Sequence, residues 1–202
     1  MKTLLICFMA LVTSFNIQAQ SPANTTPAST VKADIATPYV TFTTNQGNIV
    51  LELNPEKAPI SVANFLNYAN SGYYNGVIFH RVIKDFMIQT GGFTENMTRK
   101  ATQEPIKNEA DNGLFNNRGS IAMARTGQVD SATSQFFINV KNNYFLNNGY
   151  RDFGYAVFGN VISGMEVVDA ISQLPTGMVQ GMRNVPIEPV IVEKVSVSYS
   201  KP

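Results

Sequence analysis

The sequence is poor in the residues that most enzymes use for covalent or metal chemistry. Its 202 residues include one cysteine, one histidine and no tryptophan. A zinc site takes three or four ligands, mostly cysteine and histidine, so this chain has too few of them. A catalytic triad would have to use His80, the only imidazole. No glycine-rich phosphate loop is present either. We therefore expect neither a metal nor another cofactor.

Charge of either sign is also scarce. Only 14% of the residues are charged, and 15 Lys and Arg stand against 14 Asp and Glu. Proteins that gather nucleic acid or anionic lipid do so with an excess of basic residues, which this sequence lacks. We therefore expect no nucleic-acid partner.

The first 38 residues form two segments that precede the predicted domain. Lys2, an apolar run over residues 4–15 and Ala19 have the order of a secretory signal peptide, residues 1–19. The run is shorter than the ~20 residues of a membrane-spanning helix, although a retained anchor is the alternative. Residues 20–38, rich in Ser, Thr, Ala and Pro, indicate a flexible tether. After cleavage we expect no membrane association.

Alternation of apolar and polar residues favours a mainly β domain over residues 39–199. The predicted strands are 39–44, 48–53, 77–83, 86–90, 119–125, 134–140, 156–162 and 190–199. Helical spacing predicts helices from Pro59 to Gly72 and from Met165 to Leu174. Eight strands with two helices favour a closed eight-stranded antiparallel β-barrel capped by two α-helices.

The segment that follows His80 is the best candidate for a chemical site. A two-residue loop, 84–85, would pair Arg81 with Ile88, whereas a three-residue loop would pair Arg81 with Gln89. Opposed residues share a face, so the second register would brace a guanidinium with an amide. The first register would separate these polar groups.

The strand 134–140 would add a matching face, because alternation places Gln135 and Phe137 together. The alternative is that Arg81 is a surface cation and Phe137 a core residue. His80 points away from the face of Arg81 by the same alternation, so we expect it to have a structural role.

Four blocks of the sequence resemble the signature blocks of the cyclophilin-type peptidyl-prolyl isomerases. They are FHRVIKDFMIQTGGFT (79–94), GSIAMAR (119–125), SQFFINV (134–140) and YAVFGNVISGMEVVDAI (155–171). Residues 124–140 and 151–159 resemble the exported branch from Gram-negative bacteria, which implies a periplasmic location. The resemblance runs in order from about Tyr39 to Ser198 and implies an eight-stranded barrel with two capping helices.

Carried over position by position, the resemblance implies an active site. The implied catalytic residues are Arg81, Phe86 and Gln89. The implied substrate-binding residues are Met87, Ala124, Arg125, Gln135, Phe137, Phe145, Leu146 and Tyr155. Phe145, Tyr155 and Arg125 replace the Trp, His and Asn of the eukaryotic pattern, and all three replacements match the exported bacterial branch.

The implied activity is cis–trans isomerisation of X–Pro bonds in exported proteins during folding. Its partners would be proline-containing unfolded or partly folded polypeptides, and we expect a monomer. Rotation about an amide forms no covalent bond, so it fits a chain without a nucleophile or metal site. The alternative is a non-catalytic binding or chaperone module for proline-containing segments. A hydrolase would need a triad or a metal that the sequence lacks.

Overall fold

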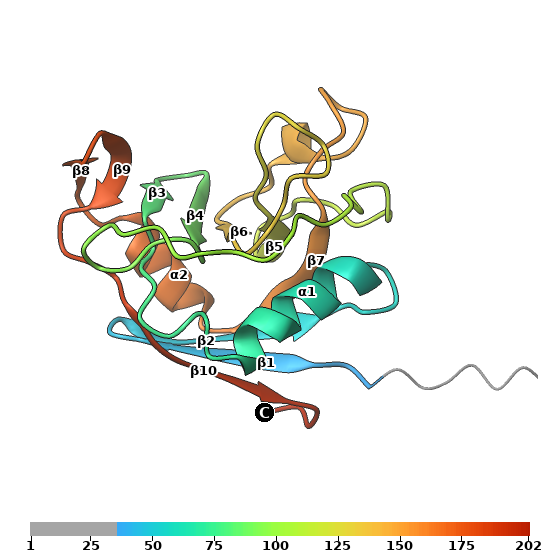
Figure 1. The fold of residues 1–202 in the computed structure, drawn as a ribbon, viewed down its shortest axis with the longest axis horizontal. Helices are drawn as coiled ribbons and strands as arrows, with labels where there is room; N and C mark the ends of the chain where they lie inside the picture. The colour runs from blue at the N-terminus through green and yellow to red at the C-terminus, as the bar shows by residue number, and fades with distance from the viewer. Residues whose placement is uncertain (1–35) are drawn as a thin grey trace, which may run out of the picture. The chain divides into compact units, whose positions relative to one another are not determined.

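The computed structural model of this chain describes residues 36–202 (Figure 1). The predicted signal peptide and the tether up to residue 35 lie outside the described residues. Within 36–202, no helix is long and apolar enough to cross a membrane.

An eight-stranded antiparallel sheet is the main element of the domain. Its strands are β1 (Tyr39–Thr44), β2 (Gly47–Leu53), β3 (Arg81–Ile83), β4 (Met87–Thr90), β5 (Ser120–Met123), β6 (Phe136–Asn139), β7 (Val157–Ser163) and β10 (Val192–Ser198). The spatial order is β10-β1-β2-β7-β5-β6-β4-β3. All eight predicted runs therefore contain a strand, which confirms a mainly β fold.

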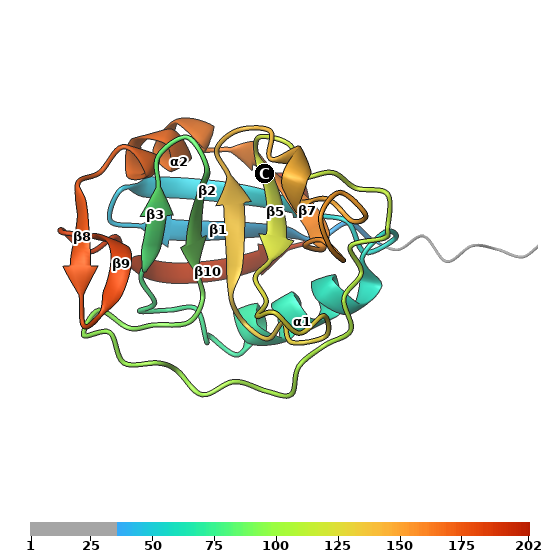
Figure 2. The same cartoon turned by 90° about the horizontal axis from the view of Figure 1, so that it is seen from above.

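The sheet curls into a half-barrel and is not shown to close. β3, β4 and β5 cross over β1, β2 and β10 (Figure 2), while β10 and β3 are the two edges. Near these edges, an isolated bridge pairs Ile78 with Ile191, and three backbone hydrogen bonds join residues 76–79 to 190–192. A closed barrel would need a full ladder between β10 and β3. The run predicted as one strand over 77–83 is a strand only at Arg81–Ile83, where it pairs with β4.

Both helices predicted from their spacing are present, and they lie on opposite sides of the strands in Figure 2. They are α1 (Pro59–Asn70) and α2 (Met165–Ser172). α1 begins at a proline, whose missing N–H costs nothing in the first turn. The next two N–H groups, of Ile60 and Ser61, donate to the Glu109 carboxylate at 3.0 and 2.7 Å. This carboxylate takes the place of a side-chain cap and suits the positive end of the helix.

Aromatic side chains join α1 to both layers of the curled sheet. Phe42 of β1, Phe65 of α1, Tyr74 and Phe136 of β6 are buried, with ring centroids 5.1 to 6.1 Å apart. The Tyr74 hydroxyl donates to the Ser134 carbonyl at 2.9 Å, so its polar end is satisfied inside the core. This cluster supports β6 from behind.

A second, two-stranded sheet was not predicted. It consists of β8 (Thr176–Val179) and β9 (Met182–Pro186). Gln180 and Gly181 form its turn, both with positive φ (48° and 82°), which is typical of a tight hairpin turn. Most side chains of β8 and β9 are exposed or half-buried, so their sequence carries little of the alternation that marks a core strand.

His80 is buried immediately before β3, with 2% of its surface exposed. Its ring packs on Phe93 at a centroid distance of 4.7 Å, and its Nδ1 has no hydrogen-bond partner among the described residues. Burial lowers the pKa of His80 from 6.5 to about 4, so the imidazole is neutral at pH 7.

We expect His80 to make the folded state less stable as the pH falls. A folded pKa of about 4 against about 6.5 in the unfolded chain means that the unfolded chain binds the proton first. The free energy of unfolding should therefore fall by about 2 kcal/mol between pH 7 and pH 5 through this group. Urea unfolding measures the difference between the free energies of unfolding at pH 7 and pH 5. In His80→Gln this difference should be smaller by about 2 kcal/mol. An equal difference in both proteins would contradict the depressed pKa.

Candidate active site

The hairpin of β3 and β4 has the three-residue loop. Arg81 pairs with Gln89, and Ile83 with Met87, which confirms the predicted register. Asp85 in the loop has a φ of 54°, a left-handed conformation that aspartate tolerates better than most side chains. The guanidinium and the amide therefore stand on one face.

This face lines a cavity of about 290 Å³. The lining residues are Arg81, Phe86, Met87, Gln89, Ala124, Arg125, Phe137, Phe145, Leu146, Arg151 and Tyr155. They come from β3, β4, β6, the short 3₁₀ helix η1 (Tyr144–Leu146) and the connecting loops. The structure thus brings together every residue of the predicted site except Gln135, and adds Arg151.

Arg81 is half-buried at the side of the cavity. Its Nη1 donates to Gln89 Oε1 at 3.4 Å and lies 3.6 Å from Met87 Sδ. Burial lowers the pKa of the Arg81 guanidinium, which still stays protonated at neutral pH. No carboxylate among residues 36–202 forms an ion pair with it. Its remaining N–H groups can donate to an oxygen or nitrogen in the cavity.

Gln135 holds Gln89 instead of lining the cavity. Gln89 Nε2 donates to Gln135 Oε1 at 2.9 Å, so one amide orients the other. The close approach requires a glycine nearby, because a Cβ on Gly92 would lie 2.5 Å from Gln135 Nε2. Gly92 therefore makes room for this amide.

The rest of the cavity is mainly apolar. Met87, Phe137 and Leu146 are each at most 8% exposed and form one cluster. Phe86 stacks on Phe145 with centroids 5.6 Å apart and planes inclined by 22°. Such a surface suits a small apolar ring and excludes water from it.

Arg125 braces the cavity wall, although the resemblance implied that it binds substrate. Its Nε donates to the Gly154 carbonyl at 2.8 Å, and its Nη2 pairs with Asp152 Oδ1 at 2.9 Å. Its guanidinium carbon lies 4.8 Å from the centre of the Tyr155 ring. The Arg125 side chain is 5% exposed, and its N–H groups donate to partners within the protein.

A buried asparagine cluster fixes the backbone of the cavity walls, and sequence reasoning missed it. Asn116, Asn139 and Asn143 are fully buried. Asn143 Nδ2 donates to the Phe86 carbonyl at 2.9 Å and to Asn139 Oδ1 at 2.7 Å. Asn116 Nδ2 donates to the Leu146 carbonyl at 3.3 Å. The available signal was an asparagine within an apolar strand, since a buried amide needs partners.

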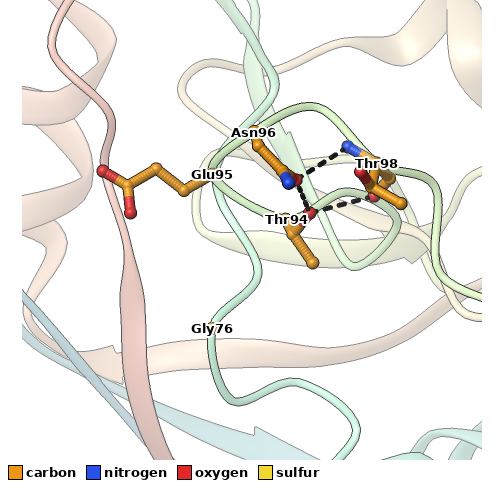
Figure 3. A pocket seen from close by; sticks show the side chains of 5 residues that line it. All are labelled: Gly76, Thr94, Glu95, Asn96 and Thr98. Carbon is orange, nitrogen blue, oxygen red and sulfur yellow. Dashed lines mark hydrogen bonds between the residues drawn. The ribbon is translucent and has the colours of Figure 1, made fainter.

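A second hollow, of about 580 Å³, lies between Gly76 and the loop 94–98 (Figure 3). Thr94 Oγ1 donates to Asn96 Oδ1 at 2.6 Å, and the Thr98 N–H donates to the same oxygen at 3.3 Å. The Glu95 side chain points away from these three residues (Figure 3). Although larger, this hollow has no converging chemical groups, so the cavity at Arg81 is the better candidate.

Comparison with known proteins shows the family to which the chain belongs. Residues 39–197 match the family described as cyclophilin type peptidyl-prolyl cis-trans isomerase/CLD. The chain is 55% identical over 188 residues to peptidyl-prolyl cis-trans isomerase A of Dickeya dadantii, covering 93% of this chain and 95% of that protein. It is 55% identical over 162 residues to peptidyl-prolyl cis-trans isomerase B of Escherichia coli, covering 79% and 99%.

Solved structures show the same likeness. A cyclophilin type peptidyl-prolyl cis-trans isomerase of Cryptosporidium parvum superposes with a TM-score of 0.69 at 29% identity, covering 82% of this chain and 99% of that one. Sequence and fold therefore agree, and the chain belongs to the cyclophilin-type peptidyl-prolyl cis-trans isomerase family.

Proposed function

We propose that this protein accelerates rotation about X–Pro bonds of exported proteins as they fold in the periplasm. The observation that carries the proposal is the Arg81 guanidinium beside a mainly apolar cavity of about 290 Å³. It is bonded to Gln89 and forms no ion pair with a carboxylate of residues 36–202. The Cryptosporidium relative was also crystallised in the presence of the dipeptide Ala-Pro, with a TM-score of 0.68 to this chain. Its use with that dipeptide, which contains an X–Pro bond, supports the same substrate class here.

The reaction needs a hydrogen-bond donor more than a nucleophile. An uncatalysed X–Pro bond rotates slowly because resonance gives it a barrier of about 18–20 kcal/mol. As the bond twists, resonance is lost and the lone pair localises on the prolyl nitrogen. A donor aimed at that nitrogen or at the prolyl carbonyl stabilises the twisted state more than the planar one. The N–H groups of Arg81 that face the cavity supply this donor.

The apolar residues take the proline itself. Met87, Phe137 and Leu146 form the floor for the pyrrolidine ring, and Phe86 closes one side. Excluding water removes solvent that would stabilise the planar, more polar amide.

The remaining site residues hold the substrate chain or support its contacts. Ala124 and Tyr155 line the cavity beside the ring pocket and contact the chain on either side of proline. Gln135 acts indirectly, by orienting Gln89. Arg125 also acts indirectly, because it supports the wall that carries Tyr155.

A module that only holds proline-containing segments would use the same apolar floor. It would gain little from an arginine oriented by two successive amides, because ordering these side chains costs conformational entropy. The Arg81–Gln89–Gln135 arrangement therefore favours catalysis over holding.

We expect Arg81→Ala to lower kcat/KM for an X–Pro peptide by about 10²-fold or more, because a donor specific to the twisted state is lost. Peptide affinity should fall much less, and Arg81→Lys should recover little because it lacks the planar fork. A protease-free exchange assay measures both quantities. Arg183→Ala, at an exposed position of β9, is the control and should change neither. A loss confined to KM would contradict the proposed role.

Export is proposed from the first residues of the sequence. Lys2, the apolar run and Ala19 have the order of a cleaved signal peptide. The likeness to the Dickeya protein covers 93% of this chain, so it extends into the residues before 36.

We expect the mature protein to begin near Gln20 when the full chain is expressed in a Gram-negative host. Mass spectrometry of the periplasmic fraction measures the N-terminus, and a chain without residues 1–19 is the control that should stay in the cytoplasm. Recovery of an intact Met1 in the membrane fraction would contradict export with cleavage.

A further inference from the structure

The cavity carries more positive charge than prolyl rotation requires. Its lining includes Arg81, Arg125 and Arg151 and no acidic residue. Asp152 neutralises Arg125 at 2.9 Å. Arg81 and Arg151 form no ion pair in the part of the chain that the structure describes. Two unpaired cations therefore border one small cavity, and only Arg81 has a role in the mechanism above.

Arg151 is held against the aromatic wall. Its guanidinium carbon lies 5.6 Å from the centre of the Phe145 ring. Phe145 stacks on Phe86, whose ring centre lies 6.0 Å from the guanidinium carbon of Arg81. The stacked pair thus has one cation near each of its members. Contact with Phe145 keeps Arg151 at the cavity while leaving its N–H groups available.

Hydrogen bonds on both sides of Arg151 fix the loop that carries it. The Gly149 N–H donates to the Asp152 carbonyl at 3.0 Å, and the Gly154 N–H donates to Asp152 Oδ1 at 2.7 Å. Asn148 Nδ2 donates to the Phe153 carbonyl at 3.0 Å. These bonds hold the loop that carries Arg151, which lines the cavity while its side chain remains exposed to solvent.

We propose that Arg151 makes this enzyme prefer prolines with an acidic side chain in a flanking residue. The inference rests on the proposed isomerase function, because it assumes that proline sits in the cavity. A guanidinium binds a carboxylate with two parallel hydrogen bonds, and no acid at the cavity competes for it. The pair is partly exposed, so the preference should be about three- to tenfold in kcat/KM and should weaken with salt.

The test compares matched peptides that differ only in Glu or Gln directly before or directly after the proline. Isomerisation is measured by exchange NMR at low and at high ionic strength. We expect a Glu peptide to be turned over about three- to tenfold faster than its Gln partner at low salt, and about equally at high salt.

Variants at position 151 separate this side chain from the general charge of the protein. Arg151→Gln should bring the Glu-to-Gln ratio close to one, and Arg151→Lys should keep part of it. Arg151→Glu should reverse the preference towards peptides that carry Lys. Arg183→Gln changes the net charge equally at an exposed position of β9, outside the cavity, and should leave the ratio unchanged.

The outcomes distinguish this inference from the function on which it rests. A ratio of one in the unmodified protein at both flanking positions would overturn the role of Arg151 while isomerisation of the Gln peptides stands. A preference that survives Arg151→Gln, or that falls equally in Arg183→Gln, would also overturn it. If the Gln peptides are not isomerised at all, the proposed function itself is wrong.

Discussion

The three-residue turn between β3 and β4 is the constraint on which the site depends. Side chains alternate across a strand, so a turn one residue shorter would oppose Arg81 to an apolar residue. In the observed register Gln89 faces Arg81 on one side and Phe137 of β6 on the other. The donor Arg81, the orienting Gln89 and Phe137 of the apolar floor thus form one row across β3, β4 and β6. The intervening residues, such as Ile138, turn into the core, so one register separates site from core.

The chemistry of amide rotation explains why this arrangement suffices. No bond is made or broken, so the protein needs only a donor fixed in position and a dry surface for the ring. Rigidity is supplied from behind, where the aromatic cluster supports β6 and the asparagine cluster holds the carbonyls of Phe86 and Leu146. The amides of this cluster bond to one another and to the backbone, and only Asn143 Oδ1 lacks a partner among residues 36–202. Another arrangement would leave more buried polar groups unpaired, so the cluster favours this one. The aromatic cluster and the asparagine cluster therefore hold Arg81 and the apolar floor in fixed positions relative to each other.

Much of this could be predicted from the sequence, because the elements concerned are marked by strong local patterns. Alternation located all eight main strands and left two registers for Arg81, and the structure shows the one that opposes it to Gln89. The predicted closure of the barrel is not shown by the structure, because closure depends on pairing between distant segments that local patterns do not encode. β8 and β9 escaped prediction because they bury little. Arg151 was not predicted because it reaches the cavity only through the fold, which no spacing along the chain encodes. Asn139 stands within an apolar strand, but its asparagine partners lie outside that strand.

The central claim is that Arg81 acts as an oriented donor held by Gln89. Gln89→Leu removes the acceptor oxygen at 3.4 Å and leaves the apolar floor in place. Exchange NMR at saturating X–Pro peptide measures the interconversion rate on the enzyme separately from the peptide Kd. We expect the bound-state rate to fall by about tenfold or more while the Kd changes by less than about threefold. An unchanged rate with weakened binding would contradict an oriented donor.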